Sequence, residues 1–467
     1  MRNAAHALVL LVSWLLLPGL APAQEPIDLG SRLEPLVDRF LIDRLQGDAQ
    51  LQLHKPTPQD VVLVADKPWE GNTSAYFTIF QDGPRYRMYY RGSHFDEQTR
   101  KAPHREVTCY AESQDGIRWI KPKLGLFEFD GSKQNNIVWD GLGTHNFTPF
   151  LDAHPQCPAE AKYKALAVGS GGGKHGLYAF QSADGIQWKL MQSEPVITKG
   201  AFDSQNLAFW DSVRGIYAEY HRGFRDGVRD IMTGTSPDFL HWTDPVYLTY
   251  PDAPKEHLYT NAVRPYDRAP HILLGFPTRF LPKTEQVEPT FMTSRDGRVF
   301  QRWTEALIPV TAPQDRDGNR SNYMASGLVQ LPDENQTYSV YGTEAYYRGP
   351  ASRLRRFTYR VDGFVSAHAA AQGGELVTKP LRFQGSRLVL NYLTTAEGAL
   401  RVEIQDAAGT PLDGFRLADC PPLRGDTLEQ TVAWTGGQDL ARLAGQPVRL
   451  RFELRQADLF ALRFAPR

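Results

Sequence analysis

The chain has 467 residues, of which 41% are hydrophobic and 11% aromatic, and its formal net charge is −1. This composition suffices for a large core. It shows no basic excess that would indicate nucleic acid or a membrane surface, so we expect neither as a partner.

Residues 1–23 carry Arg2, an apolar run Ala7–Leu17 and an Ala21-Pro22-Ala23 ending. These features predict a secretory signal peptide that is cleaved before Gln24. The apolar run is too short to span a bilayer, and no later run is long enough. We therefore expect a secreted or periplasmic protein without a membrane span.

Residues 24–60 contain the apolar segment Leu36–Asp43, which we expect to pack against the wall of the domain that follows. After this segment a seven-residue turn recurs, as Ser113-Gln-Asp-Gly-Ile-Arg-Trp119, Ser182-Ala-Asp-Gly-Ile-Gln-Trp188 and Ser236-Pro-Asp-Phe-Leu-His-Trp242. A fourth copy runs from Ser294 to Trp303 with three added residues. Ser and Asp side chains can hydrogen-bond the turn backbone and Gly accepts positive φ, so these turns are predicted to be architectural.

Short apolar runs precede each turn in the same order, which predicts five repeated antiparallel units. The first runs are Tyr76–Phe80, Phe147–Leu151, Leu207–Trp210, Ala262–Tyr266 and Ala325–Leu331. Fourth runs are predicted at Asn136–Trp139, Pro195–Thr198, Val246–Thr249 and Ala306–Val310, and Val61–Ala65 is expected to complete the fifth unit. Four strands per unit indicate a propeller, and closure by the N-terminal strand leaves no open edge.

The predicted fold is therefore all-β, a five-bladed β-propeller over residues 61–364 followed by a β-sandwich over residues 365–467. The C-terminal segment alternates apolar and polar residues between turns rich in Gly and Asp, as expected for a sandwich. We interpret it as a packing module, with carbohydrate binding as the alternative.

In such a propeller the first strands converge on one mouth, where a ligand is expected to bind. Four carboxylates near this mouth are candidate catalytic groups: Glu70, Asp203, Glu219 and Glu344. The candidate substrate-binding residues are Asn72, Arg91, His145, Asn146, Asn206, Arg222, Asn261, Arg279 and Tyr323. A charged residue at a strand end is usually only solvated or paired, so the prediction depends on their convergence.

Carboxylates across a channel meet the needs of glycosidic bond cleavage, in which one group protonates the leaving oxygen and another attacks the sugar or activates water. Asp203 or Glu219 is the expected acid, Glu70 the nucleophile or base, and Glu344 a supporting group. Arginines at the mouth could bind an acidic sugar. No spacing of His or Cys predicts a metal site, and we expect no cofactor.

The repeat, the Ser-x-Asp-Gly-x-x-Trp turns and the trailing sandwich resemble the five-bladed glycoside hydrolases of families 32 and 43. The turns are also similar to sialidase Asp-boxes. The resemblance implies a glycosidase acting on a carbohydrate, with Glu70 and Asp203 at the carboxylate positions of the first and third blades. The invertase-type Asn-Asp-Pro-Asn-Gly signature is absent, so fructose or arabinose specificity is not implied. A polysaccharide lyase and a non-catalytic glycan-binding propeller are the alternatives.

Overall fold

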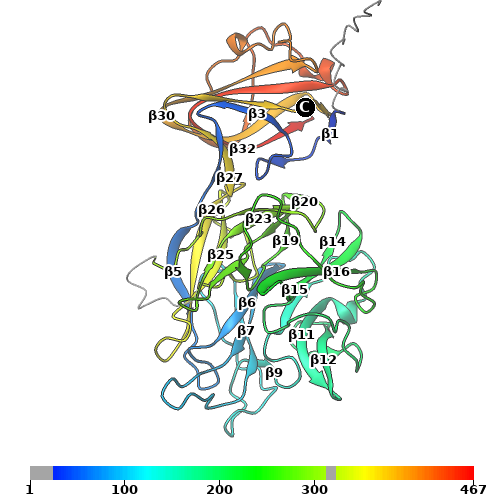
Figure 1. Cartoon of the computed structure of the whole chain (residues 1–467), viewed down its shortest axis with the longest axis vertical. Coiled ribbons are helices and arrows are strands. Elements are labelled where there is room, and N and C mark those ends of the chain that lie inside the picture. Colours follow the sequence, from blue (N-terminus) through cyan, green and yellow to red (C-terminus); the bar gives the residue numbers. More distant parts are fainter. Residues whose placement is uncertain (1–24, 312–321, 467) are drawn as a thin grey trace, which may run out of the picture.

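The computed structural model describes residues 25–311 and 322–466, and the predicted signal peptide lies outside them. The described chain is built of β-strands and three short 3₁₀ turns. Figure 1 shows two bodies stacked along the long axis, with the larger one formed by the strands from β5 to β26. No helix in the described ranges is long and apolar enough to cross a membrane.

The larger body contains four antiparallel sheets of four strands each, and in each sheet the strands pair in sequence order. The first is β6 (Ala75–Asp82), β7 (Arg85–Gly92), β8 (Val107–Ser113) and β9 (Ile137–Trp139), and the second is β10 (Thr148–Leu151), β11 (Tyr163–Gly171), β12 (Lys174–Ser182) and β13 (Lys189–Leu190). The third is β14 (Leu207–Asp211), β15 (Ile216–Arg225), β16 (Val228–Ser236) and β17 (Val246–Tyr247), and the fourth is β19 (Arg264–Tyr266), β20 (Ala269–Gly275), β23 (Phe291–Ser294) and β24 (Phe300–Trp303). A small sheet of β18 (His257–Leu258), β21 (Thr278–Leu281) and β22 (Gln286–Pro289) extends the fourth.

A fifth sheet is completed by a strand from the beginning of the chain. It consists of β25 (Thr337–Glu344), β26 (Arg353–Arg360) and β5 (Thr57–Val64). The pairing of Val64 with Arg353 and Leu63 with Leu354 confirms the closure predicted for this N-terminal segment. The predicted first strand of this repeat is reduced to isolated bridges, at Met324 and Val329.

Two of the fourth strands lie elsewhere than predicted. In the second sheet the fourth strand is β13, whereas the predicted segment Pro195–Thr198 contributes an isolated bridge between Ile197 and Leu177. The fourth strand of the fourth sheet also differs. It is β24, whereas the sequence pattern indicated Ala306–Val310. The reason is local. Asp296 accepts hydrogen bonds from the backbone of Arg298 and Val299, so the chain reverses at these residues and the next strand starts within the longer fourth copy of the turn. Phe300 then pairs directly with Ser294.

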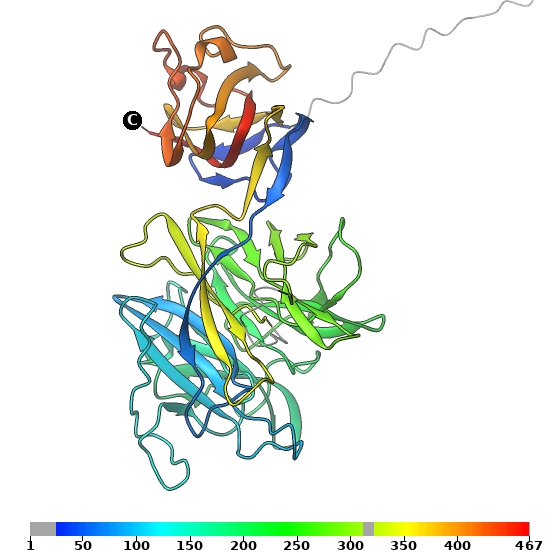
Figure 2. The ribbon, with the colours of Figure 1, turned by 90° about the vertical axis from the view of Figure 1, so that its left-hand side faces the viewer.

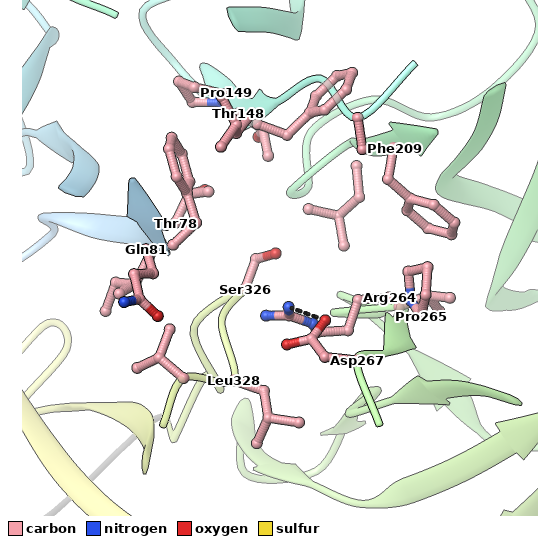
Figure 3. A pocket seen from close by; sticks show the side chains of 18 of the residues that line it. Thr78, Gln81, Thr148, Pro149, Phe209, Arg264, Pro265, Asp267, Ser326 and Leu328 are labelled. Carbon is pink, nitrogen blue, oxygen red and sulfur yellow. Dashed lines mark hydrogen bonds and ion pairs between the residues drawn. The ribbon is translucent and has the colours of Figure 1, made fainter. Parts of the chain in front are cut away.

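The first strands of the five units line one central cavity of about 490 Å³. Figure 3 shows Thr78, Thr148, Phe209, Pro265 and Leu328 around it, one from each unit. The five units therefore all contribute to the lining of this cavity. In this cavity Arg264 and Asp267 form an ion pair with a separation of 3.4 Å.

The recurring turns share one hydrogen-bond network, as their Ser and Asp residues predicted. In the second turn Ser182 Oγ accepts from the backbone of Asp184 and Gly185, and Asp184 Oδ1 accepts from Ile186 and Gln187 at 2.8 Å each. Trp188 Nε1 closes the turn by donating to the Gly185 carbonyl at 3.0 Å. The turns that begin at Ser113 and Ser236 repeat this pattern, and in the latter Phe239 takes the glycine position with φ 71°.

The second body is a ten-stranded sheet that combines both ends of the chain. Its C-terminal strands are β27 (Val365–Ala369), β28 (Gly374–Thr378), β29 (Leu381–Phe383), β30 (Arg387–Asp406), β31 (Asp426–Thr431) and β32 (Val448–Ala465). Its N-terminal strands are β1 (Ile27–Gly30), β2 (Glu34–Pro35), β3 (Ile42–Gly47) and β4 (Gln50–Leu53). Figure 2 shows the blue N-terminal strands among the yellow to red C-terminal ones.

This arrangement corrects, in part, the expectation that residues 24–60 pack on the wall of the following domain. Asp38 does pair with Arg295 of the larger body at 2.7 Å, but the strands of this segment belong to the second body. β3 pairs with β28 and β4 with β27, and Leu41 and Ile42 are buried in the core of the second body. Only Val37 of the apolar segment is part of the core of the larger body. The physical reason is that burial of these side chains inside the second sheet removes more apolar surface from water than contact with one wall.

Replacing Asp184 with Ala is expected to destabilise the protein by about 1–2 kcal/mol, because two backbone N–H groups lose a charged acceptor. A lowered melting temperature in calorimetry is the measurement. Glu194→Ala is the matched control, since Glu194 is 53% exposed and pairs only with Lys174, which is 63% exposed. Equal melting temperatures for the two variants would contradict the role assigned to the turn.

Candidate functional site

The loop before β14 presents Asp203 at the mouth where the first strands begin. Two asparagines hold this loop, since the side-chain amides of Asn146 and Asn206 both donate to the carbonyls of Phe202 and Ser204 at 2.6–3.1 Å. Both asparagines are buried. The Asp203 side chain between these anchors is 63% exposed, so it is available to a ligand.

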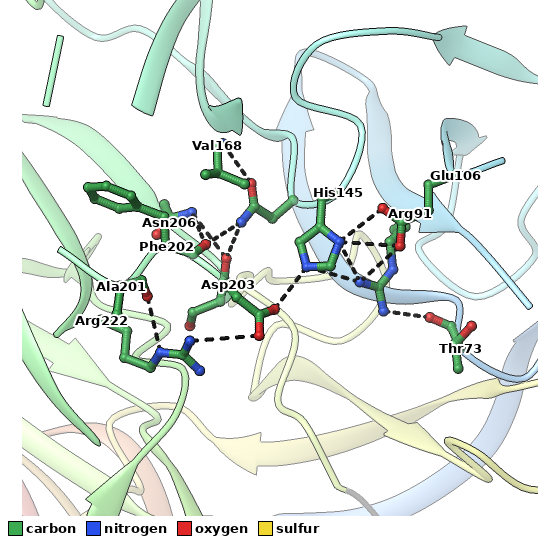
Figure 4. A network of polar contacts seen from close by, with 12 residues as sticks. Thr73, Arg91, Glu106, His145, Val168, Ala201, Phe202, Asp203, Asn206 and Arg222 are labelled. Carbon is green, nitrogen blue, oxygen red and sulfur yellow. Dashed lines mark hydrogen bonds and ion pairs between the residues drawn. The ribbon is translucent and has the colours of Figure 1, made fainter. Parts of the chain in front are cut away.

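His145 lies between two carboxylates (Figure 4). Its Nε2 is 2.9 Å from Asp203 Oδ1, and its Nδ1 is 2.9 Å from Glu106 Oε2. Only a doubly protonated imidazole can donate to both carboxylates at once. The geometry therefore favours the imidazolium form of His145.

Two arginines flank this trio. Arg91 donates to the Thr73 carbonyl at 2.8 Å and to the Tyr346 hydroxyl at 2.9 Å, and it lies 3.6 Å from Glu106. On the other side Arg222 donates to the Ala201 carbonyl at 3.1 Å and lies 3.7 Å from Asp203 (Figure 4). Asp203 is thus set between two cationic side chains, His145 and Arg222.

Tyrosine rings form the wall of the mouth. The ring of Tyr323 meets those of Tyr76, Tyr259 and Tyr346 edge-on, with centroids 5.5–6.5 Å apart. Arg91 lies over Tyr76 at 4.8 Å and Arg222 over Tyr259 at 4.5 Å. Tyr76 has φ 58°, a strained conformation for a residue with a side chain. Such strain is concentrated at functional sites in proteins.

The charges of the trio reinforce each other. The hydrogen bond from His145 lowers the pKa of Asp203 to about 2. Burial acts to raise the pKa of Glu106, but the His145 hydrogen bond and the Arg91 charge outweigh it and lower that pKa. Burial acts to lower the pKa of His145, but its hydrogen bonds to Asp203 and Glu106 raise it above the usual value of 6.5. At neutral pH both carboxylates are ionised.

Glu70, the predicted nucleophile or base, does not lie with Asp203. Its side chain is fully buried, 2.5 Å from Lys121 Nζ. It also accepts hydrogen bonds from the Tyr90 hydroxyl at 2.6 Å and from the Lys67 backbone at 3.1 Å. These contacts form a closed structural network within the first sheet, without access to a ligand.

Glu219 and Glu344 are also held inside the protein. Glu219 is fully buried, and its Oε2 lies 2.7 Å from His221 Nδ1; burial raises its pKa. His221 Nε2 is 3.0 Å from the carbonyl of Lys199, at the start of the Asp203 loop. Glu344 is 1% exposed and pairs with Arg355 at 2.5 Å. Neither carboxylate is exposed to a ligand in this structure.

Of the predicted binding residues, Arg91, His145, Arg222 and Tyr323 line the mouth, and Asn146 and Asn206 anchor the Asp203 loop. Asn72 donates to the carbonyls of Phe95 and Gly349, and Asn261 donates to the carbonyl of Tyr220. Arg279 is engaged by Glu288 and Glu256. These last three have structural contacts and do not touch the trio.

Glu106, Tyr76 and Tyr259 also belong to this site but are not among the catalytic and binding residues predicted from the sequence. Glu106 directly precedes β8, and the alignment of third-strand starts was a usable signal for it. The orientation of Tyr76 depends on its positive φ, which no feature of the sequence predicts. In the described residues no group of three or more His, Cys, Asp or Glu side chains is arranged to hold a metal ion.

Comparisons with known proteins give similarity in fold only. No family profile and no curated sequence matches the chain. An N-acetylgalactosamine deacetylase from F. plautii, solved with blood group B trisaccharide, is 12% identical, with a TM-score of 0.45 over 67% of this chain and 96% of that one. A β-1,2-mannobiose phosphorylase from Listeria innocua is 12% identical, with a TM-score of 0.43 over 67% and 97%.

An endo-arabinase from Bacteroides thetaiotaomicron is 9% identical, with a TM-score of 0.41 over 63% of this chain and 96% of that one. All three are named for carbohydrates. At these identities and scores the likeness says nothing about what this chain binds or cleaves.

Replacing Glu70 with Gln is expected to destabilise the protein by about 3 kcal/mol, because it removes one partner of a buried ion pair. Urea unfolding measures this loss. A variant of unchanged stability that had lost activity would instead place Glu70 in the chemistry.

Replacing Asp203 with Asn is expected to lower the pKa of His145, because the imidazolium loses the carboxylate that faces its Nε2. An NMR titration of the His145 ring in both proteins measures the shift. Glu70→Gln serves as the control and should leave this titration unchanged. An unaltered pKa in Asp203→Asn would show that the two side chains are not in contact in solution.

Proposed function

We propose that the five sheets form a five-bladed β-propeller, that the second body is a β-sandwich, and that the mouth is the active site of an exported glycoside hydrolase. The observation that carries this proposal is the exposed, ionised Asp203 carboxylate held against the His145 imidazolium. Nucleophile and proton donor are the two groups that glycosidic bond cleavage needs.

In the proposed reaction His145 donates its Nε2 proton to the glycosidic oxygen as the bond to the anomeric carbon breaks. Asp203 faces that carbon as a carboxylate and stabilises the positive charge that develops there. Water then supplies the hydroxyl group of the new reducing end, and its remaining proton restores the imidazolium. Glu106 keeps His145 oriented and protonated through its hydrogen bond to Nδ1. Asp203, which the sequence suggests as the acid alongside Glu219, is here the carboxylate, because a carboxyl group with a pKa of about 2 has no proton to donate at neutral pH.

A polysaccharide lyase is the second candidate, and the juxtaposition of arginines with tyrosines favours it. Arg91 lies over the Tyr76 ring and donates to Tyr346. An arginine can neutralise a uronate carboxylate while a base removes the neighbouring proton. A lyase product carries a double bond that absorbs ultraviolet light and forms without uptake of water. A non-catalytic glycan-binding propeller predicts binding without turnover.

Replacing Asp203 with Asn is expected to reduce the rate of reducing-sugar release by about 100-fold or more, as for loss of one group that stabilises charge in the transition state. The assay covers neutral, uronic and sulfated glycans. Asp413→Asn is the control, because Asp413 is 90% exposed on the second body. Full activity in Asp203→Asn would exclude this site.

The pH profile provides a second check on the same proposal. Activity should fall as the pH rises through the raised pKa of His145, where the imidazolium loses its proton, and again as the pH falls toward the Asp203 pKa of about 2. Acid denaturation is monitored by circular dichroism at each pH. A profile without an alkaline limb would contradict the role of His145.

A further inference from the structure

The hairpin of β15 and β16 continues beyond Arg222 and carries a second arginine on the same face. Arg222 and Phe224 are two residues apart on β15, so their side chains point to the same side of the strand. Arg229 of β16 is the cross-strand partner of Phe224, so its side chain lies on that side too. The hairpin thus presents an Arg–Phe–Arg group, Arg222, Phe224 and Arg229, next to Asp203.

The two guanidinium groups share the same aromatic rings. Arg222 lies 4.5 Å from the centre of the Tyr259 ring and 5.4 Å from that of Phe224. Arg229 lies 5.5 Å and 5.6 Å from the same centres, and 4.4 Å from that of Phe280. Two like charges around one ring repel each other, and this repulsion weakens when an anion lies between them.

Among the residues that the structure describes, Arg229 has no acidic partner. Within residues 25–311 and 322–466 no carboxylate lies within 4.0 Å of its guanidinium, and its buried Nε finds no acceptor there. Its neighbour Arg225, on the opposite face of the hairpin, does have an acidic partner. Arg225 is paired with Asp230 and lies over the Tyr247 ring.

The mouth as a whole carries excess positive charge. Arg91, Arg222, Arg229 and the protonated His145 stand against two carboxylates, Glu106 and Asp203. Arg222 lies near both Asp203 and Phe224. Its positive charge therefore shields an anion bound at the hairpin from the negative charge of Asp203. Phe224 is 52% exposed and offers an apolar surface to the ring of a sugar that carries the anion.

We infer that Arg222 and Arg229 form a subsite for an anionic group of the glycan, a carboxylate or a sulfate ester. Guanidinium groups bind either oxyanion through paired N–H donors. The subsite adjoins Asp203, so the charged sugar is bound next to the bond that is cleaved. This inference rests on the proposed function for its substrate but can be tested by binding alone.

The experiment uses the Asp203→Asn protein, so that probes are not consumed. Calorimetry measures the binding of three oligosaccharides of equal length: an oligogalacturonate, a sulfated galacto-oligosaccharide and a neutral galacto-oligosaccharide. At least one anionic probe is expected to bind about tenfold or more tightly than the neutral one, as for one charge-assisted hydrogen bond. Comparison of the two anionic probes distinguishes carboxylate from sulfate.

Adding Arg229→Gln is expected to remove this preference, and Arg118→Gln to preserve it. Arg118 is the control because it is 89% exposed in a recurring turn. Arg229→Lys, which keeps the charge but not the paired donors, should retain part of the preference. Melting temperatures verify that each variant is folded, and if Arg229→Gln fails to fold, the Lys variant and loss of the preference in high salt decide the question.

Equal binding of anionic and neutral probes, binding of none of them, or a preference that survives Arg229→Gln would each overturn the subsite. Failure of the proposed function looks different. In that case Asp203→Asn retains the turnover of the wild type, while the anion preference and its dependence on Arg229 persist.

Discussion

The pairing of β5 with β26 is the constraint on which the rest of the structure depends. It completes the fifth sheet and covers the edge that β26 would otherwise expose. The same two chain segments continue side by side into the second body, where β4 pairs with β27 through Leu53 and Val365. The two chain segments that complete the fifth sheet therefore also join the ten-stranded sheet. The mouth is held in shape by both.

Burial separates the carboxylates of the larger body into two groups. Glu70, Glu219 and Glu344 are buried, and Lys121, His221 and Arg355 lie against them at 2.5–2.7 Å. A buried charge without such a partner would be very costly. Asp203 also has cationic neighbours, but its loop is anchored by amides, so the carboxylate itself remains exposed. Exposure combined with ionisation is what makes it available for chemistry.

Much of the fold could be predicted from the sequence because its signals are local. Each Ser–Asp–Trp turn contains its own hydrogen bonds within seven residues, and the strand order follows from their repetition. The site was harder to predict, since Glu70 and Asp203 follow similar aromatic residues and differ through distant contacts, such as that of Glu70 with Lys121, which is 51 residues away in sequence. The orientation of Tyr76 depends on a strained backbone. That no carboxylate of the described residues pairs with Arg229 depends on which acids the fold places near it.

The closure by β5 also has a consequence for folding kinetics. The recurring turns close short loops and can form within microseconds, whereas Val64 must find Arg353 across most of the chain. Contacts of such sequence separation slow folding, because the entropy of the intervening loop is lost before the contact forms. β5, the first strand of the larger body in the chain, is thus the last to pair. Until residues 353–360 have emerged from the ribosome, the chain has no closed native state.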